Sequence, residues 1–204
     1  MALDEKTFLN ICSKSLEKEG MGSTEKKIQL QIASALMDAL SNEGCKIFTE
    51  YPYPENNKDE CDVVITDKND FLKPTHWIEI KPVWGRNECN YWSVQKFFGE
   101  APFRYDIEKL NTARTHDKTS KAWFLVIIQS DEIPNPRADL EEPKARARLT
   151  PSHLAKGISL WSMNSRCEIK SIHEKNYHIL LWSVEGYNKE AIKRGTDGIY
   201  RWSC

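Results

Sequence analysis

The sequence predicts an α/β protein. Helical and β-strand patterns follow one another in the order α-β-β-β-α-β, with additions at both ends. The first of two amphipathic helical patterns is the N-terminal addition, and the second begins this order. The apolar run 122–128 is typical of a central strand that is covered on both faces. Because 204 residues are enough for one substantial core, we expect a single domain over 1–204, with its core at about 24–128 and a C-terminal elaboration at about 129–204.

Two helices are expected before the first strand. The first begins after Asp4, a good N-cap, and stops at Gly20. The second begins near Ser23 or Thr24 and ends at Gly44. In both segments apolar residues recur at helical spacing, which indicates one buried face on each helix.

Three strands come next, over 46–51, 61–66 and 76–81. The second and third are expected to form a hairpin with a long connection. Pro82 cannot donate a ladder hydrogen bond, so we expect the third strand to end there or to become an edge.

The remaining segments are less regular. Residues 84–103 are expected to be irregular or partly helical, and a helix is expected over 104–115. The stretch 131–150 is rich in proline and charge and is predicted to be a surface loop. Two late strands are predicted over 166–172 and 177–184.

The composition indicates a globular protein, with 40% hydrophobic and 29% charged residues. We find neither a signal-peptide pattern at the start nor an apolar run long enough for a membrane span, and the six cysteines lack zinc-site spacing. We therefore expect a cytoplasmic protein with reduced thiols and no membrane partner. The net charge of −1 gives no general attraction for nucleic acid. Residues 1–70 have an excess of acidic side chains, and residues 81–121 have an excess of basic ones. This difference is either ordinary surface variation or the sign of an acidic half that holds a metal beside a basic half that holds the substrate.

Three charged residues stand where buried strands normally have none. Asp62 opens the apolar run of the second strand, and Glu79 and Lys81 lie two apart on the third. Because side chains alternate along a strand, Glu79 and Lys81 are expected on the same face. Without a functional role, Glu79 and Lys81 would be a surface ion pair on an edge strand, and Asp62 would be a turn or strand-start residue.

This pattern resembles the PD-(D/E)XK nuclease superfamily over roughly residues 24–128. Asp62, Glu79 and Lys81 carry the resemblance, within the α-β-β-β-α-β order; Cys61 stands where the family name has proline. The resemblance implies a restriction-endonuclease-like core, a central mixed sheet flanked by helices. It also implies a metal-dependent nuclease that hydrolyses phosphodiester bonds, and we expect a DNA endonuclease.

The resemblance implies a Mg²⁺ cofactor, with Mn²⁺ able to substitute. Asp62, Glu79 and the backbone carbonyl of Ile80 are the expected ligands, and hard oxygen ligands suit this ion. Lys81 is expected to orient or activate the attacking water, or to stabilise charge on the phosphate. Without metal, repulsion should raise the pKa of at least one carboxylate, whereas partial burial beside a metal can lower the pKa of Lys81.

Three residues are candidate accessory groups. Glu25 in the second helix could bind metal through a water, or it could simply complement the helix dipole. Glu50 could support the site or could be a solvated strand end. Gln95 follows Lys81 where some family nucleases carry a glutamine, but their accompanying tyrosine is replaced by Gly99.

Aromatic and basic residues alternate between Trp84 and Tyr105. This segment could bind nucleic acid by stacking and by phosphate contacts, with Arg86, Trp92, Lys96 and Arg104 as the candidates. Alternatively it packs on the core or forms a homodimer interface. The alternative function is a non-catalytic module on the same fold that binds nucleic acid or a protein through this segment. A third possibility, an unrelated hydrolase or a structural protein, would be favoured if Asp62 and Glu79 lay far apart.

Overall fold

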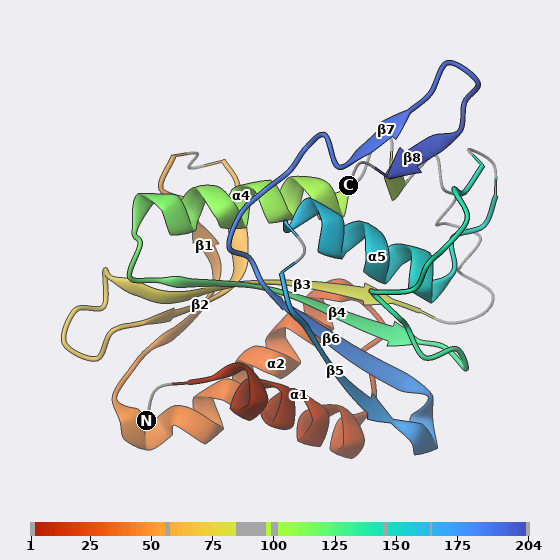
Figure 1. Ribbon diagram of the computed structural model, residues 1–204. Helices are drawn as coiled ribbons and strands as arrows, with labels where there is room; N and C mark the ends of the chain where they lie inside the picture. The colour runs from red at the N-terminus through yellow and green to blue at the C-terminus, as the bar shows by residue number, and fades with distance from the viewer. Residues whose placement is uncertain are drawn as a thin grey trace.

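A six-stranded sheet with helices on both faces organises the described part of the chain (Figure 1). The computed structural model describes residues 3–55, 58–84, 97–98, 102–144, 147–163 and 165–202. The strands of the sheet are β1 (Ile47–Pro52), β2 (Glu60–Thr66), β3 (Pro74–Val83), β4 (Lys121–Gln129), β5 (Cys167–Ile172) and β6 (Tyr177–Ser183). The helices are α1 (Glu5–Glu19), α2 (Glu25–Leu40), α4 (Pro102–His116) and α5 (Pro151–Trp161). The predicted α/β class, with a central mixed sheet between helices, is confirmed.

The sheet has the strand order β1-β2-β3-β4-β6-β5. Only the β3–β4 pair in it is parallel among the described strands, and α4 makes the crossover between them. Helices α1 and α2 cover one face, and α4 and α5 cover the other (Figure 1). The run Trp123–Ile128 in β4 is buried throughout, so the prediction of a central strand covered on both faces is confirmed.

Local signals place the first two helices where the sequence predicts them. The side chain of Asp4 accepts a hydrogen bond from the Thr7 N–H (2.7 Å), and Gly20 ends α1 with a positive φ of 74°. Thr24 caps α2 by accepting from the Lys27 N–H (3.2 Å). A 3₁₀ turn (Ser41–Glu43) follows α2.

The third strand does not end at Pro82, because β3 continues to Val83 and Pro82 pairs with Ile127 of β4. The alternative expectation, that the strand becomes an edge there, is correct. The ladder between β2 and β3 has its last pair at Val63 and Ile78, so β3 is an edge toward β2 beyond that point. N–H groups alternate in direction along a strand. The N–H of Ile80 points toward β2, so an N–H at position 82 would point to the same side, where β3 has no ladder partner. Proline at this position therefore removes no hydrogen bond from the sheet.

The C-terminal half holds elements that the sequence reading missed. Helix α5 starts at Pro151 after the N-cap Thr150, and two short strands, β7 (Ile192–Arg194) and β8 (Tyr200–Trp202), pair with each other. The late strands β5 and β6 are confirmed.

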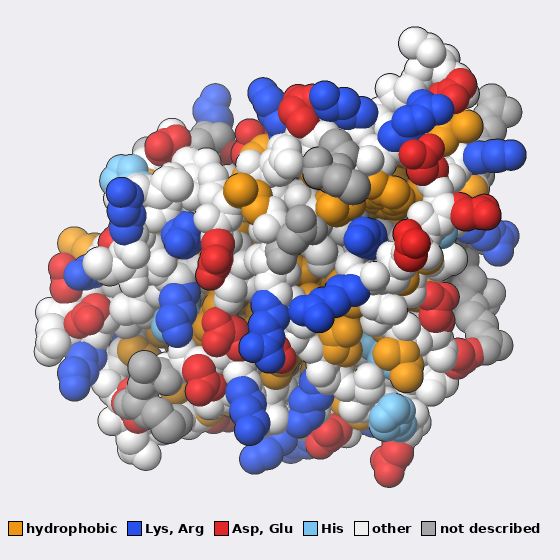
Figure 2. All heavy atoms as spheres, viewed as in Figure 1, with side chains coloured by type: hydrophobic (Ala, Val, Ile, Leu, Met, Phe, Trp, Pro, Cys, Tyr) orange, Lys and Arg blue, Asp and Glu red, His pale blue; other side chains and the backbone are white. Residues whose placement is uncertain are grey.

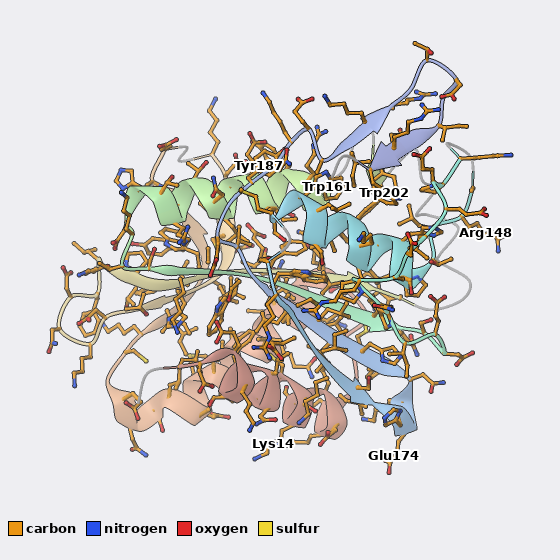
Figure 3. The ribbon with its side chains drawn as sticks, in the orientation of Figure 1. Lys14, Arg148, Trp161, Glu174, Tyr187 and Trp202 are labelled. Carbon is orange, nitrogen blue, oxygen red and sulfur yellow. The ribbon has the colours of Figure 1, made fainter. Side chains whose placement is uncertain are left out.

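Aromatic residues after β3 pack into the core. Phe97, Phe98 and Phe103 are buried, and Phe98 contacts both Trp161 and Trp202. Figure 3 places these two tryptophans on the α4/α5 side of the sheet. For the phenylalanines the core alternative is therefore correct, whereas Tyr91 and Trp92 lie outside the described residues.

Charges of both signs are mixed over the face shown in Figure 2, so this face carries no broad acidic or basic region. Four cysteines in the described ranges are free thiols: Cys12, Cys45, Cys61 and Cys167. Within those same ranges, no helix combines the length and the apolar character that crossing a bilayer requires.

Candidate active site

The three predicted site residues meet where β2 and β3 separate. Asp62 is the first β2 residue beyond the last ladder pair, and its Oδ2 accepts a hydrogen bond from the Ile80 N–H (2.7 Å). The carboxylate thus replaces a strand-to-strand bond. Val63 pairs with Ile78, so Asp62 and Glu79 are the next residues along the two neighbouring strands, and the case in which they lie far apart is ruled out.

Asp62 is also held from the α1/α2 side. The Gln29 amide on α2 donates from Nε2 to Asp62 Oδ1 over 2.7 Å. Gln29 is buried beside Ile28 on the inner face of α2. The sequence reading missed Gln29, although a polar residue next to the apolar stripe of a helix was the available signal.

Glu79 is 1% exposed and lies on the face of β3 that α4 covers. Its Oε1 accepts a hydrogen bond from the Tyr53 hydroxyl (2.7 Å), and Lys109 Nζ on α4 lies 3.5 Å from the same oxygen. The Tyr53 ring stacks on Trp77 with ring centroids 5.5 Å apart. Tyr53 was not predicted to belong to the site.

Lys81 lies in a chain of alternating charges. Its Nζ is 2.6 Å from Glu25 Oε1 on α2 and 3.2 Å from Asp106 Oδ2 on α4. Asp106 is buried and contacts Lys109 through Oδ1 at 2.8 Å. Lys109 in turn contacts Glu79, so this series of ion pairs joins α2, β3 and α4. The contact with Lys81 places Glu25, one of the accessory candidates, in the cluster, and Asp106 is a cluster residue that sequence reasoning missed.

The cluster carries an excess of negative charge. Four carboxylates, from Glu25, Asp62, Glu79 and Asp106, face two lysines, which leaves a formal charge of −2 when all are ionised. Burial raises the pKa of Glu79 well above its ordinary value, and the charges of Asp106 and Asp62 add to the shift. Burial also raises the pKa of Asp62, although Lys81 opposes this. The expected rise of carboxylate pKa values in a metal-free site is confirmed.

Without a metal ion, the pKa of Lys81 is raised, whereas the lowered pKa expected for a lysine beside a bound metal stays a prediction. Burial does disfavour its charged form, but the carboxylates of Asp106, Asp62 and Glu79 outweigh burial and raise the pKa of Lys81 above the ordinary lysine value. Lys81 is therefore an ammonium ion at neutral pH. In the metal-free protein its chemistry is that of a positive charge and hydrogen-bond donor.

The donor set fits one hard divalent ion in charge, though not as a ready-made cage. Among the described residues, no three Asp, Glu, His or Cys side chains are arranged to hold a metal ion. Magnesium commonly binds through one or two protein carboxylates and takes its other ligands from water and phosphate. Asp62 and Glu79 would supply the two carboxylates, and the carbonyl of Ile80, which lies between Glu79 and Lys81 in the sequence, would supply a third oxygen. The formal charge of −2 equals what one divalent cation neutralises.

Two other predicted residues take no part in this cluster. Glu50 is exposed on β1 and pairs with Lys26. Arg104 lies on α4, where its charge acts on Tyr187 and Glu190. Four candidates lie outside the described residues: Arg86, Trp92, Gln95 and Lys96.

Comparisons of this chain with known protein families, with curated proteins and with solved structures found no match. The site must therefore be interpreted from its own chemistry.

Proposed function

We propose that the protein is a Mg²⁺-dependent nuclease, a DNA endonuclease with a restriction-endonuclease-like core. The observation that carries this proposal is the buried Glu79 carboxylate beside the half-buried Asp62, with the Lys81 ammonium next to them and a formal charge of −2 in the cluster when all its groups are ionised. Lys81 and Lys109 balance only part of the formal charge, and an excess of carboxylates at one point of a fold is typical of a cation-binding site.

The order of elements supports the proposed core. Helix α2, strands β1, β2 and β3, helix α4 and strand β4 follow one another as in the α-β-β-β-α-β pattern. The charged residues lie at the point where the β2–β3 ladder ends.

The side chains divide the work of phosphodiester hydrolysis. Asp62 and Glu79 would hold the cation, with the Ile80 carbonyl as a third oxygen. When bound, a divalent cation supplies Lewis-acid activation of water and of the phosphoryl group. Lys81 holds its proton and donates hydrogen bonds to the attacking water or to a phosphate oxygen. Lys109 adds a second positive charge on the α4 side.

Cleavage of supercoiled plasmid in Mg²⁺ or Mn²⁺ tests the proposal. Asp62→Asn keeps the size of the side chain and should lower the rate at least about 100-fold, as loss of a preorganised charged group commonly does. Asp139→Asn, at an exposed aspartate, is the matched control and should cut at the wild-type rate. Equal rates in Asp62→Asn and wild type would overturn the proposal.

The second candidate is a non-catalytic binding module on the same fold. It is favoured by the closed ion pairs of Lys81 with Glu25 and Asp106, which would then serve only to join α2, β3 and α4. Retention of DNA in a gel-shift assay, without cleavage in either Mg²⁺ or Mn²⁺, would support this function instead.

A further inference from the structure

Each site carboxylate receives one hydrogen bond from a neutral side chain outside its own strand. Gln29 donates to Asp62 from the α1/α2 side of the sheet, and Tyr53 donates to Glu79 from the α4/α5 side, both over 2.7 Å. Both donors are nearly enclosed, with 8% of Gln29 and 4% of Tyr53 exposed, so solvent hardly competes for these bonds.

The neutrality of these donors matters. A lysine or arginine in either place would cancel the negative charge that attracts a cation, whereas an amide or a phenol orients the carboxylate and leaves its charge intact. Each carboxylate oxygen has two lone pairs, so an oxygen that accepts one bond still has capacity for another partner.

The contacts also fix which oxygen of Glu79 faces its neighbours. Tyr53 donates to Oε1, and Lys109 Nζ lies 3.5 Å from the same oxygen. The Tyr53 ring is itself held between Trp77, on which it stacks, and Lys109, whose Nζ lies 5.3 Å from the ring centre. The hydroxyl is therefore presented to Glu79 by a ring with little freedom to move.

We propose that Tyr53 and Gln29 are positioning residues that orient Glu79 and Asp62 for a divalent cation. This inference rests on the proposed function, because it assigns the two residues a role toward the metal of that site. Partners that orient metal ligands typically change metal affinity by about 10- to 100-fold when they are removed.

The experiment is a Mn²⁺ titration of the full chain, with free Mn²⁺ measured by electron paramagnetic resonance. Tyr53→Phe keeps the ring and its stacking, and Gln29→Met keeps the length of the side chain. Each should weaken Mn²⁺ binding by about 10- to 100-fold. Cleavage by both variants should return toward the wild-type rate when Mn²⁺ is saturating, since the ligands themselves remain.

Tyr51→Phe is the matched control. It also removes a phenolic hydroxyl from a ring that packs on Trp77, but Tyr51 belongs to β1 and contacts that ring edge-on. Its Mn²⁺ affinity should equal that of the wild type. Unfolding temperatures without metal show whether each variant is folded; if Tyr53→Phe does not fold, Gln29→Met decides the test.

Two results would overturn the inference in different ways. Unchanged Mn²⁺ affinity in folded Tyr53→Phe and Gln29→Met, with a wild type that binds Mn²⁺ and cuts DNA, would remove the positioning role and leave the proposed function intact. A wild type that neither binds Mn²⁺ nor cuts DNA would overturn the proposed function and the inference together.

Discussion

At the scale of single residues, the site is defined by charges that a buried strand does not normally carry. Glu79 is almost fully enclosed, yet among the described residues three further carboxylates and two lysines belong to the same cluster. The carboxylates of Asp106, Asp62 and Glu79 raise the pKa of Lys81, and burial above all, with the charges of Asp106 and Asp62, raises the pKa of Glu79. Substitution of either residue should therefore have a measurable and distinct effect.

Lys81→Met should separate chemistry from metal binding. The variant loses the ammonium group that, under the proposed function, would face the substrate, so cleavage should fall at least about 100-fold. Asp62 and Glu79 remain, and the site becomes more negative, so Mn²⁺ binding should persist. Lys118→Met, at an exposed lysine, is the control for both measurements. Loss of Mn²⁺ binding together with cleavage would assign Lys81 a structural role instead.

The stability of the metal-free protein should fall as pH rises above the ordinary glutamate pKa of about 4.3. The pKa of Glu79 is raised in the folded state, so over this window the folded protein keeps a proton that the unfolded chain has lost. The free energy of unfolding therefore decreases with pH, by at most about 1.4 kcal/mol per pH unit for one group. Urea denaturation in EDTA, from pH 4.5 upward, measures this slope.

Glu79→Gln removes that titration and should flatten the slope relative to the wild type. Glu174→Gln is the control, since Glu174 projects from the edge of the molecule far from the α4/α5 layer (Figure 3). A slope that is the same in wild type and Glu79→Gln would show that Glu79 ionises normally in the fold.

At the scale of elements, the site depends on the packing of α2 and α4 against strand β3. Helix α4 supplies Asp106 and Lys109, and its own position is fixed by the aromatic cluster around Phe97, Phe98 and Trp161. Helix α5 approaches that cluster closely at Gly157. A β-carbon at this position would lie 2.9 Å from Cε1 of Phe98 and 3.1 Å from Cε1 of Phe97.

Gly157→Ala should therefore destabilise the protein. Both rings are packed against Trp161 and have little room to yield, so we expect a loss of about 1–3 kcal/mol, typical of an overfilled core. Chemical denaturation measures the loss. Lys156→Ala, on the same helix and half-buried, should change stability far less. An unchanged stability in Gly157→Ala would mean that α5 stands further from the two phenylalanines.

Element boundaries show which local signals were sufficient. The caps Asp4 and Thr24 place α1 and α2 to within a residue, because capping uses atoms that are neighbours in sequence. The start of α5 carries the same type of signal, Thr150 followed by Pro151, and was predictable by the same rule. Strands β7 and β8 have only three residues each, which is too short for a periodic pattern to be recognised.

At the scale of the whole molecule, a net charge of −1 and a mixed-sign surface give no general attraction for DNA. Binding must then come from local interactions. Replacing Arg86 and Lys96 together by alanine should weaken DNA binding and reduce the slope of log affinity against log salt by about 2 units, because each phosphate that a side chain neutralises adds roughly 0.9 to that slope. Fluorescence anisotropy over a salt series measures the slope.

The control is the pair Lys14→Ala and Lys18→Ala on the outer face of α1. Figure 3 shows Lys14 beneath the sheet, on the side away from α4 and α5. This control should keep the wild-type slope. If the slope is also unchanged without Arg86 and Lys96, the segment after β3 is not part of the DNA interface.

The sequence alone determined the parts of the site that follow from strand periodicity. Alternation along β3 puts Glu79 and Lys81 on one face, and an acid before an apolar run marks Asp62, because these rules involve only neighbouring residues. Only the tertiary structure decided which groups surround them. Gln29 is 33 positions from Asp62, and Tyr53 is 26 positions from Glu79.

Those distant partners change the chemistry of the residues that the sequence predicted. Asp106 on α4 makes the largest of the contributions that raise the pKa of Lys81, ahead of Asp62 and Glu79, and Glu25 on α2, 56 positions away, adds to it. The physical reason is that a pKa depends on the charges within a few ångströms, whichever part of the chain supplies them. Local pattern selects the residues on a strand, and the packing of α2 and α4 on the sheet sets their charge.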